Sequence, residues 1–407
     1  MIATTPFEPA ATTAAVASSR DLPDFSLVAG GPLYRLFCRL TLADAQLHYL
    51  PRRILAVLLL IWLPPVILAL LEGYAFSGVR VPLARDPSVH LRLLLAVPLL
   101  LAAEPVAHDW MRSVARRFVE RGIVVGGTRQ RLEAAVNSAH RLRDSIYPEL
   151  MIAVFVLTVG IAINRHRVAG LEDSTWYWPR EGVTGSPTLA GWWAGLISLP
   201  VFQFLFLRWY FRLFIWVQFL WRVSRLPLRL AVTQPDLAGG LGFLGSASEG
   251  FWVLLVAQGA IGAAVIAHGI SFGGVTLLAY KLEICALCAL ALLWVAAPLV
   301  PFAPMLVRAM RAGGAAYGQL SQRYAVGFEQ KWMSGSSQGE QLLGSPDIQS
   351  LADLRNAYAA VRSMRLIPIG RGTMIRLMLC PLIPVAPLAL TLVPIDRLLA
   401  RLLAAFF

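Results

Sequence analysis

The sequence has few charged residues and almost no lysine. Asp, Glu, Lys and Arg together make up 14% of its 407 residues, whereas hydrophobic residues make up 57%. Soluble domains carry about 25% charged residues, so this composition excludes an ordinary soluble domain and indicates a multi-pass membrane protein. Lys281 and Lys331 are the two lysines, so arginine supplies most of the positive charge behind a net charge of +13. Because the arginines flank apolar segments, we expect them to orient the chain in a membrane rather than to bind nucleic acid.

Cysteine and histidine are also scarce, and no spacing among them suggests a metal site. The four cysteines lie in or beside apolar stretches, and Cys285-x-x-Cys288 lacks the two further ligands that a structural zinc site needs. Residues 240–245 spell GxGxxG without a preceding strand, and residues 335–339 spell GxSxG inside a linker. The sequence therefore predicts no catalytic residue, no metal and no cofactor, and we do not expect an enzyme.

Seven apolar runs are long enough to cross a bilayer. They cover residues 54–71, 91–108, 148–164, 189–210, 251–272, 277–304 and 374–394. The loops between them alternate between arginine-rich and nearly balanced, so the positive-inside rule predicts an N-terminus inside and a C-terminus outside. We therefore expect an all-α integral membrane protein with about seven transmembrane helices.

The segments outside the spans define four regions of the chain. Residues 1–31 lack the pattern of a signal peptide, and their Ala/Thr/Ser composition predicts a disordered tail. Residues 32–308 contain the first six spans with helical extensions, residues 309–372 form a cytoplasmic helical segment, and residues 373–407 contain the seventh span and an amphipathic end. The extensions include residues 128–150, running directly into the third span, and residues 305–333, with a glycine pair as a joint. Together they predict a cytoplasmic collar of helices.

Three arginines occur in the apolar stretch RWYFRLFIWVQFLWR. The helix that enters at the fourth span should continue to about Ser224, too long for one bilayer crossing, so Arg208 and Arg212 lie near the cytoplasmic interface and Arg222 beyond it. These arginines either extend to lipid phosphates or face a polar axis in an oligomer. Glu104 on the second span is a third candidate partner.

A polar face ends the second span. Glu104, His108 and Arg112 follow one another at four-residue intervals, so they share one side of a helix. A carboxylate is costly in lipid unless it is protonated or paired, and Arg112, Arg208 or Arg212 are its candidate partners. The face is either a structural ion pair or part of a permeation or proton pathway.

Two loop features remain. After the fourth span, the turn at Asp236 and the glycines Gly239, Gly240 and Gly242 form either a capped re-entry loop or an anion-binding nest that acts as a hinge. In addition, PLVPFAP and PLIPVAP place prolines three apart at the end of the sixth span and inside the seventh, where they should break the helices as two packed kinks or around a binding site. These prolines are Pro298, Pro301, Pro304, Pro381, Pro384 and Pro387.

The phrases TQPDLAGGLGFLG (233–245), LLGSPDIQSLADLRNAYAAVRSMR (342–365) and LTLVPIDRLLARLL (390–403) resemble a family of uncharacterised bacterial multi-pass membrane proteins with a PDxAGGLGFLG-type loop. The resemblance implies a bacterial inner-membrane protein and carries no activity. Relatives favour His-Pro-Asp where this chain has Gln234-Pro235-Asp236, so no histidine at that place is implied to be essential.

Two functional hypotheses follow from these features. The first is an oligomeric channel or channel-like pore, with anions as candidate permeant ions and the collar joining the subunits. The alternative is a non-transport scaffold or sensor that binds a partner or anionic lipid, and a secondary transporter ranks third. We expect a homo-oligomer in the lipid bilayer that handles at most an ion or small solute. The partner of Arg208 and Arg212 separates the hypotheses, because a symmetric axis favours the pore, lipid the scaffold, and Glu104 of the same chain a structural ion pair.

Overall fold

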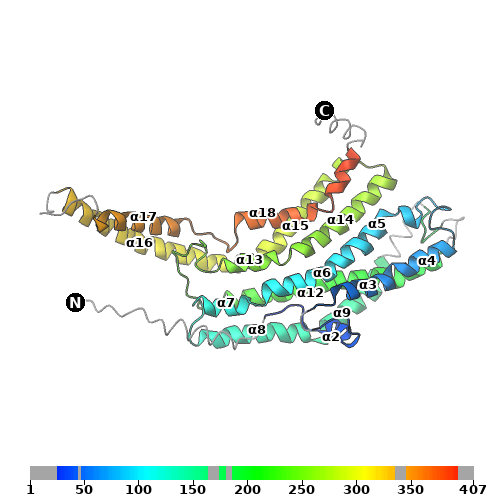
Figure 1. The fold of residues 1–407 in the computed structure, drawn as a ribbon, viewed down its shortest axis with the longest axis horizontal. Coiled ribbons are helices and arrows are strands. Elements are labelled where there is room, and N and C mark those ends of the chain that lie inside the picture. The colour runs from blue at the N-terminus through cyan, green and yellow to red at the C-terminus, as the bar shows by residue number, and fades with distance from the viewer. Residues whose placement is uncertain (1–24, 45–46, 164–173, 180–185, 335–344, 393–407) are drawn as a thin grey trace.

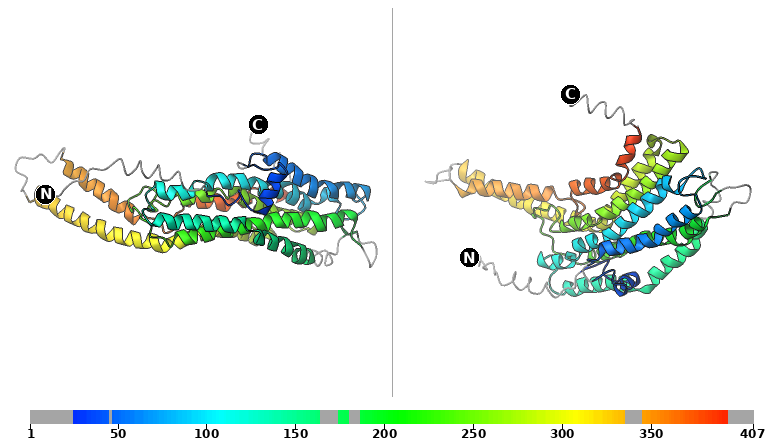
Figure 2. Two further views of the ribbon diagram at one scale, coloured as in Figure 1. Left: turned by 90° about the horizontal axis from the view of Figure 1, so that it is seen from below. Right: turned by 45° about the vertical axis from the view of Figure 1, so that its right-hand side comes forward.

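The computed structural model describes residues 25–44, 47–163, 174–179, 186–334 and 345–392. Within these ranges the regular elements are helices, and two isolated β-bridges around Thr175 are the only strand-like pairings. Figures 1 and 2 show an elongated molecule in which α16 and α17 project beyond the other helices at one end, while α4 and α5 lie at the opposite end. The all-α fold class is confirmed.

A long helical stretch, Leu189–Val223, lies near the middle of the chain. Before it come α2 (Pro32–Arg39), α3 (Leu50–Ile61), α4 (Leu63–Leu71), η1 (Leu83–Arg85), α5 (Pro87–His90), η2 (Leu91–Ala96), α6 (Val97–Met111), α7 (Val114–Glu120), α8 (Thr128–Asp144), α9 (Ile146–Phe155) and η3 (Val156–Gly160). From it onward come α11 (Leu189–Trp193), η4 (Ala194–Ser198), α12 (Leu199–Val223), α13 (Phe243–Glu249), α14 (Trp252–Gly273), η5 (Leu277–Tyr280), α15 (Lys281–Ala296), η6 (Ala297–Phe302), α16 (Ala303–Trp332), α17 (Pro346–Arg362), α18 (Arg371–Leu379), η7 (Cys380–Leu382) and η8 (Ala386–Leu392).

Six helical stretches of the described residues are long and apolar enough to cross a membrane. They are Leu50–Leu71, Pro87–Glu120, Ile146–Ile163, Leu189–Val223, Trp252–Gly273 and Leu277–Trp332. Many of their large hydrophobic side chains face outward, as Leu71 does with 80% of its surface exposed. A helix satisfies all its backbone hydrogen bonds internally, so such helices are stable in lipid. The protein is therefore a multi-pass membrane protein.

The expected seventh span is not a continuous helix where the structure describes it. α18, η7 and η8 cover residues 371–392 as three short pieces, with Pro381 in η7 and Pro387 in η8. Each proline lacks the amide hydrogen that the helical ladder needs, so the α-helix ends there. The count of seven spans is not confirmed, and residues 393–407 lie outside the described residues.

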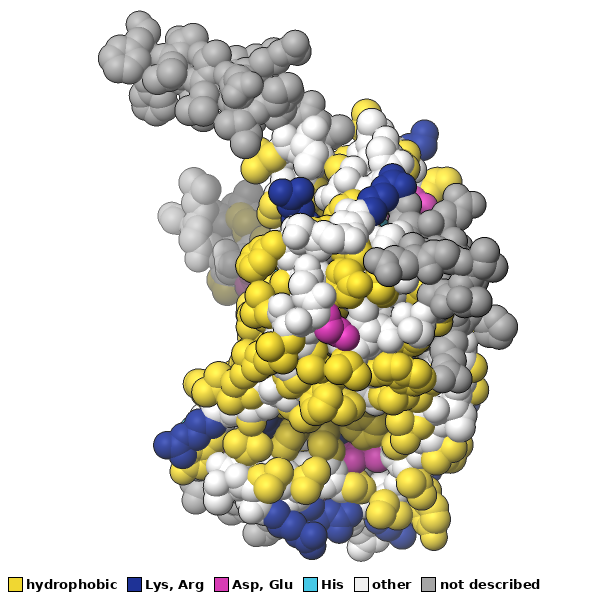
Figure 3. All heavy atoms as spheres, turned by 90° about the vertical axis from the view of Figure 1, so that its right-hand side faces the viewer, with side chains coloured by type: hydrophobic (Ala, Val, Ile, Leu, Met, Phe, Trp, Pro, Cys, Tyr) yellow, Lys and Arg dark blue, Asp and Glu magenta, His cyan; other side chains and the backbone are white. Residues whose placement is uncertain are grey.

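The core lies around α12. Trp209, Trp216 and Phe219 on this helix are almost completely buried, and α12 packs against α6, α8 and α9. The helix ends at Val223 with Ser224 as its C-cap, which confirms the predicted length. Figure 3 views the α4 and α5 end, where hydrophobic side chains cover much of the described surface.

Two predicted extensions differ in detail. A helix does not run straight from residue 128 into the third span, because Ser145 has extended backbone angles between α8 and α9. Pro148 requires this break, since proline is tolerated in the first turn of a helix but not in its interior. In contrast, the glycine pair at 313 and 314 forms no joint, and α16 is continuous through it. Gly313 is buried against Val232, and a side chain there would collide with it.

α16 and α17 form an antiparallel hairpin, which we call the α16–α17 hairpin. Lys331 near the end of α16 contacts Asp347 at the start of α17, with Nζ 2.9 Å from Oδ2. Gly318 faces the ring of Tyr358 farther along. The Ser345 hydroxyl accepts a hydrogen bond from the Asp347 amide, confirming the predicted cap of α17.

Candidate functional site: a buried ion-pair cluster

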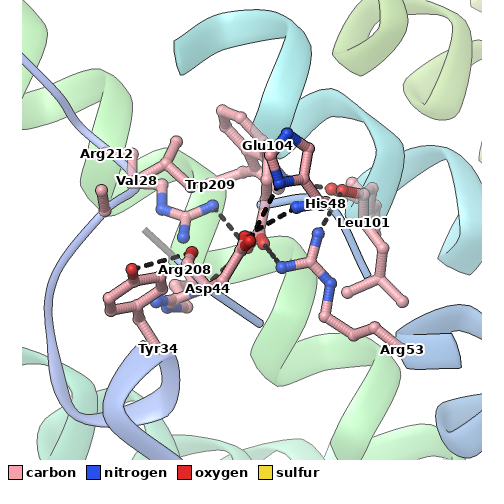
Figure 4. Close-up of polar contacts among 12 residues, drawn as sticks. Val28, Tyr34, Asp44, His48, Arg53, Leu101, Glu104, Arg208, Trp209 and Arg212 are labelled. Carbon is pink, nitrogen blue, oxygen red and sulfur yellow. Dashed lines mark hydrogen bonds and ion pairs between the residues drawn. The ribbon is translucent and has the colours of Figure 1, made fainter. Parts of the chain in front are cut away.

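The centre of the site is the Glu104 carboxylate on α6. Arg212 donates to its Oε1 at 2.8 Å, Arg208 donates to the same oxygen at 2.9 Å, and Nη1 of Arg53 lies 2.8 Å from Oε2. Figure 4 shows these guanidinium groups converging on Glu104 from different helices. A fifth member, Glu149 on α9, accepts from Nε of Arg208 at 2.6 Å. We call these five residues the ion-pair cluster.

The cluster joins the first four spans. Arg53 belongs to α3, Glu104 to α6, Glu149 to α9, and both Arg208 and Arg212 to α12. Because residues four apart on a helix lie on the same face, Arg208 and Arg212 reach one carboxylate together. All five side chains are at least nine-tenths buried. The cluster thus fixes the relative positions of four spans inside one chain.

A proline in α6 explains the position of Arg53. Pro105 lacks the amide hydrogen that would bond to the Leu101 carbonyl in a regular helix. Nη2 of Arg53 donates to that carbonyl at 3.3 Å. The guanidinium of Arg53 therefore has two partners. It donates to the backbone carbonyl that the proline leaves without a helical hydrogen bond, and it pairs with the neighbouring Glu104 carboxylate.

The cluster carries one net positive charge, because three arginines face two carboxylates. Two of the guanidinium groups make cation–π contacts. That of Arg212 lies 4.9 Å from the Trp209 ring centroid, and that of Arg53 lies 5.7 Å from the Phe37 ring centroid. Among the described residues, Nη2 of Arg212 and Nε of Arg53 have no hydrogen-bond partner.

Residues 25–31 form a bent, non-helical segment that packs beside the cluster, and we call it the N-terminal strap. Phe25 is fully buried, and its ring stacks on Phe219 with centroids 4.2 Å apart. The Ser26 hydroxyl contacts Nδ1 of His108 at 2.8 Å. The Phe25 amide donates to the Arg112 carbonyl at 3.1 Å. Although the sequence predicts a disordered tail to residue 31, its last seven residues are ordered, because aromatic packing and hydrogen bonds outweigh their weak local propensity. Residues 1–24 lie outside the described residues.

Two carboxylates hold the junction between the strap and α2. Asp144 accepts from the Gly31 amide at 3.1 Å, and Glu149 accepts from the Leu33 amide at 2.8 Å through the oxygen that does not contact the cluster. Burial alone would raise the pKa of Asp144, but its bond to Arg143 lowers that pKa below the ordinary value. Glu149, itself a member of the cluster, thus holds the first turn of α2, the helix that follows the strap.

His140 on α8 lies under the strap. Its ring stacks on Phe25 with centroids 6.1 Å apart, and its Nε2 is buried with no hydrogen-bond partner among the described residues. Burial, with the nearby Arg143 guanidinium, lowers the pKa of His140. The neutral ring is thus the form that fits this place.

The structure brings some of the predicted polar residues together and separates others. Glu104, Arg208 and Arg212 meet in the cluster, whereas His108 contacts the strap. The side chains of Arg112 and Arg222 are exposed. Arg53 and Glu149 were not predicted as site residues, although each is a charged residue at the edge of an apolar run. A charged residue at that position was the feature of the sequence that could have identified them.

The side chain of Asp236 caps the loop that follows α12. Asp236 accepts hydrogen bonds from the amides of Ala238 at 2.9 Å, Gly240 at 3.1 Å and Gly242 at 2.9 Å. Gly239 and Gly240 have φ of 64° and 97°, a region that favours glycine. Because a carboxylate of the chain fills the set of amides predicted as an anion nest, the geometry favours the capped loop.

The two proline motifs break their helices at separate contacts. Pro298 and Pro301 lie in the 3-10 turn η6, which packs against α12, and Pro304 lies in the first turn of α16. η7 instead packs against α14, where Gly259 leaves room for the Pro381 carbonyl. Pro384 lies between η7 and η8, and Pro387 in η8. Each motif thus acts as a packed kink in the structure.

Comparisons with protein-family models, curated proteins and solved structures give no match. The fold and the cluster define the class of protein, a multi-pass helical membrane protein whose first four spans meet at a buried ion-pair cluster.

Proposed function

We propose that the protein is a non-transport scaffold or sensor of the bacterial inner membrane whose α16–α17 hairpin binds a partner protein. The observation that carries this proposal is the pairing of Arg208 and Arg212 with Glu104 of the same chain. Arginines that select ions in a pore face a water-filled path. Here they are buried, and they hold helices together.

We expect the hairpin to lie in the cytoplasm, because the positive-inside rule predicts that side for the arginine-rich loops. α16 has 30 residues, and at 1.5 Å per residue it is about 45 Å long. Attraction to anionic lipid falls off within a Debye length, about 8 Å at physiological salt. The outer part of the hairpin is therefore better suited to a protein partner than to the membrane surface.

The hairpin buries little of its own surface. Leu306 and Gly313 are the buried residues of α16, and Val361 is that of α17. Leu320, at 52%, and Val326, at 46%, are exposed along α16. Because helices gain most of their stability from packing, a helical partner that covers these side chains would stabilise the hairpin.

The first test measures flux. The purified protein is reconstituted in liposomes, and chloride and potassium flux are compared with those of Arg208→Gln/Arg212→Gln. We expect wild type to give no flux above empty liposomes. A flux that the double variant abolishes or makes less selective would contradict the proposal and favour the anion-conducting pore, and a coupled uptake would favour a secondary transporter.

The second test addresses the hairpin. Leu320→Arg and Val326→Arg should each abolish a chemically cross-linked complex formed in native membranes. Ser350→Arg and Asn356→Arg add the same charge at exposed polar positions of α17, the other helix of the hairpin, so they should keep the complex. Mass photometry in nanodiscs shows whether the partner is a second copy, as the expected homo-oligomer requires. The absence of any hairpin-dependent complex would refute this function.

A further inference from the structure

A pocket lies at the opposite end of the molecule from the hairpin. Its volume is about 560 Å³, within the range of about 300–1,000 Å³ that holds small ligands. Residues of α4, α5, η2, α11, η4 and α14 line it, together with Trp62 before α4 and the loop at residues 176–178. The pocket therefore lies between five of the six spans and shares no residue with the ion-pair cluster or the hairpin.

Aromatic side chains dominate one part of the wall. They are Trp62, Trp176, Tyr177, Trp178 and Trp192. Backbone hydrogen bonds anchor the loop that carries three of them, because the Trp176 amide donates to the Val81 carbonyl at 3.0 Å and the Trp178 amide to the Thr175 carbonyl at 3.0 Å. The backbone of this loop is thus held in place by the fold.

Two wall segments have an uncommon backbone. η2 and η4 are π-helical turns within the second and fourth spans, and they contribute Arg92, Ala194 and Ser198 to the wall. Such turns are rare and occur frequently at functional sites, since they widen a helix and re-aim its side chains.

One buried acid lines the pocket. Asp86, exposed by 2%, accepts from Nε1 of Trp176 at 3.1 Å and from the Ser88 amide at 3.0 Å. Nδ1 of His268 lies 3.5 Å from its Oδ1. A carboxylate has about four acceptor positions, so these two hydrogen bonds leave capacity for a ligand. Although burial raises its pKa, the His268 and Trp176 contacts lower the pKa of Asp86 overall, so it is ionised at neutral pH.

We propose that this pocket binds a small organic cation, an amine or quaternary ammonium with apolar substituents. Aromatic faces attract such a centre, more strongly where water is excluded, and Asp86 supplies the opposite charge. The basic side chains of the wall have neighbours of their own: the Arg92 guanidinium lies 5.6 Å from the Phe202 ring centroid and donates to the Ser88 hydroxyl, and His268 faces Asp86. The formal charges of Asp86 and Arg92 cancel in this wall, so the preference for a cation rests on the aromatic faces and on the remaining acceptor positions of Asp86.

The test compares three probes of similar shape on the full chain in nanodiscs. Benzyltrimethylammonium is the cation, neopentylbenzene is its neutral counterpart, and benzenesulfonate is the anion. Tryptophan fluorescence and calorimetric titration measure binding. We expect the cation to bind at least about tenfold more tightly than the neutral probe. Equal binding of the neutral probe, tighter binding of the sulfonate, or no binding of the cation would overturn the proposal.

Variants locate the site. Asp86→Asn and Trp178→Leu should each weaken cation binding by about tenfold, while Trp221→Leu, which removes an exposed tryptophan outside the pocket, should not. Unchanged melting of Trp178→Leu in nanodiscs shows that the fold persists even if Asp86→Asn destabilises it. Cation binding that neither variant weakens places the cation elsewhere and refutes this site. The hairpin takes no part in the assay, so its outcome is independent of the scaffold proposal.

Discussion

Replacing Glu104 with glutamine tests the ion-pair cluster directly. The carboxylate contacts three guanidinium groups at 2.8–2.9 Å, and its side chain is 4% exposed. Glutamine keeps the shape but not the charge, so the net charge of the cluster rises from +1 to about +2. Removing one partner from a buried ion pair costs about 3–5 kcal/mol because a charge is left without compensation. We therefore expect Glu104→Gln to reduce the folding equilibrium constant by roughly 10²- to 10⁴-fold.

The assay is reversible unfolding in bicelles, followed by tryptophan fluorescence. Glu133→Gln is the matched control, since Glu133 pairs with Arg129 at 2.9 Å but is 36% exposed. A surface pair of this kind contributes about 0.3–0.5 kcal/mol, so the control should stay close to wild type.

A second variant separates charge from packing. Glu104→Gln/Arg53→Gln returns the net charge of the cluster to about +1, so we expect it to recover part of the lost stability. If Glu104→Gln were no less stable than Glu133→Gln, the cluster would not hold the spans together, and the argument against pore-lining arginines would fail.

Four further changes test other parts of the structure. Gly31→Ala should loosen the strap by about 1–3 kcal/mol, because φ is 89° there and a Cβ would lie 3.0 Å from Oε1 of Glu149; faster proteolysis within residues 25–31 would report it. Acidification from about pH 7.5 to about pH 5 should also loosen the strap, because the lowered pKa of His140 means that the loosened form binds more protons than the native form. The contribution of His140 to the stability of the strap is complete above about pH 6.5 and falls below that pH. Hydrogen exchange of the strap amides measures this, and its dependence on pH should be weaker in His140→Gln. Gly259→Leu should displace η7 from α14 and lower the melting temperature. A side chain at Gly274 would meet open space, so substitution there should not displace a neighbouring element. Asp236→Ala should cost about 1–3 kcal/mol because buried amides lose their acceptor, and Asp236→Asn should cost less; equal melting of both would contradict the capped loop.

Regular features of the fold followed from local patterns. The length of α12, the cap of α17 and the interruption of helices at prolines depend on apolar runs and on residues within one turn, so the sequence predicts them well. The strap was missed for the opposite reason. Its order comes from contacts such as Phe25 with Phe219, which lie far apart in the sequence.

The ion-pair cluster shows the same division between local and long-range information. The sequence placed Glu104 on one helix face and named Arg208 and Arg212 as candidate partners, because charged residues in apolar runs need compensation. It did not identify Arg53, since a charge at the edge of a span looks like an ordinary interfacial arginine. What distinguishes Arg53 is the Leu101 carbonyl freed by Pro105 on another helix, and only the packing of α3 against α6 brings the two together.

The two proposals assign different functions to the two ends of the molecule. The ion-pair cluster fixes the first four spans, and the pocket lies between spans at the end away from the hairpin. His268 on α14 contacts Asp86 at the start of the second span, and the cluster's Glu104 lies on α6 of that span. A ligand that moves Asp86 away from His268 would therefore act on the helix that carries Glu104. Coupling of this kind requires that ligand affinity differ between two arrangements of the spans, so a cation-induced change in proteolysis of the strap would support a sensor, and its absence would leave a rigid scaffold.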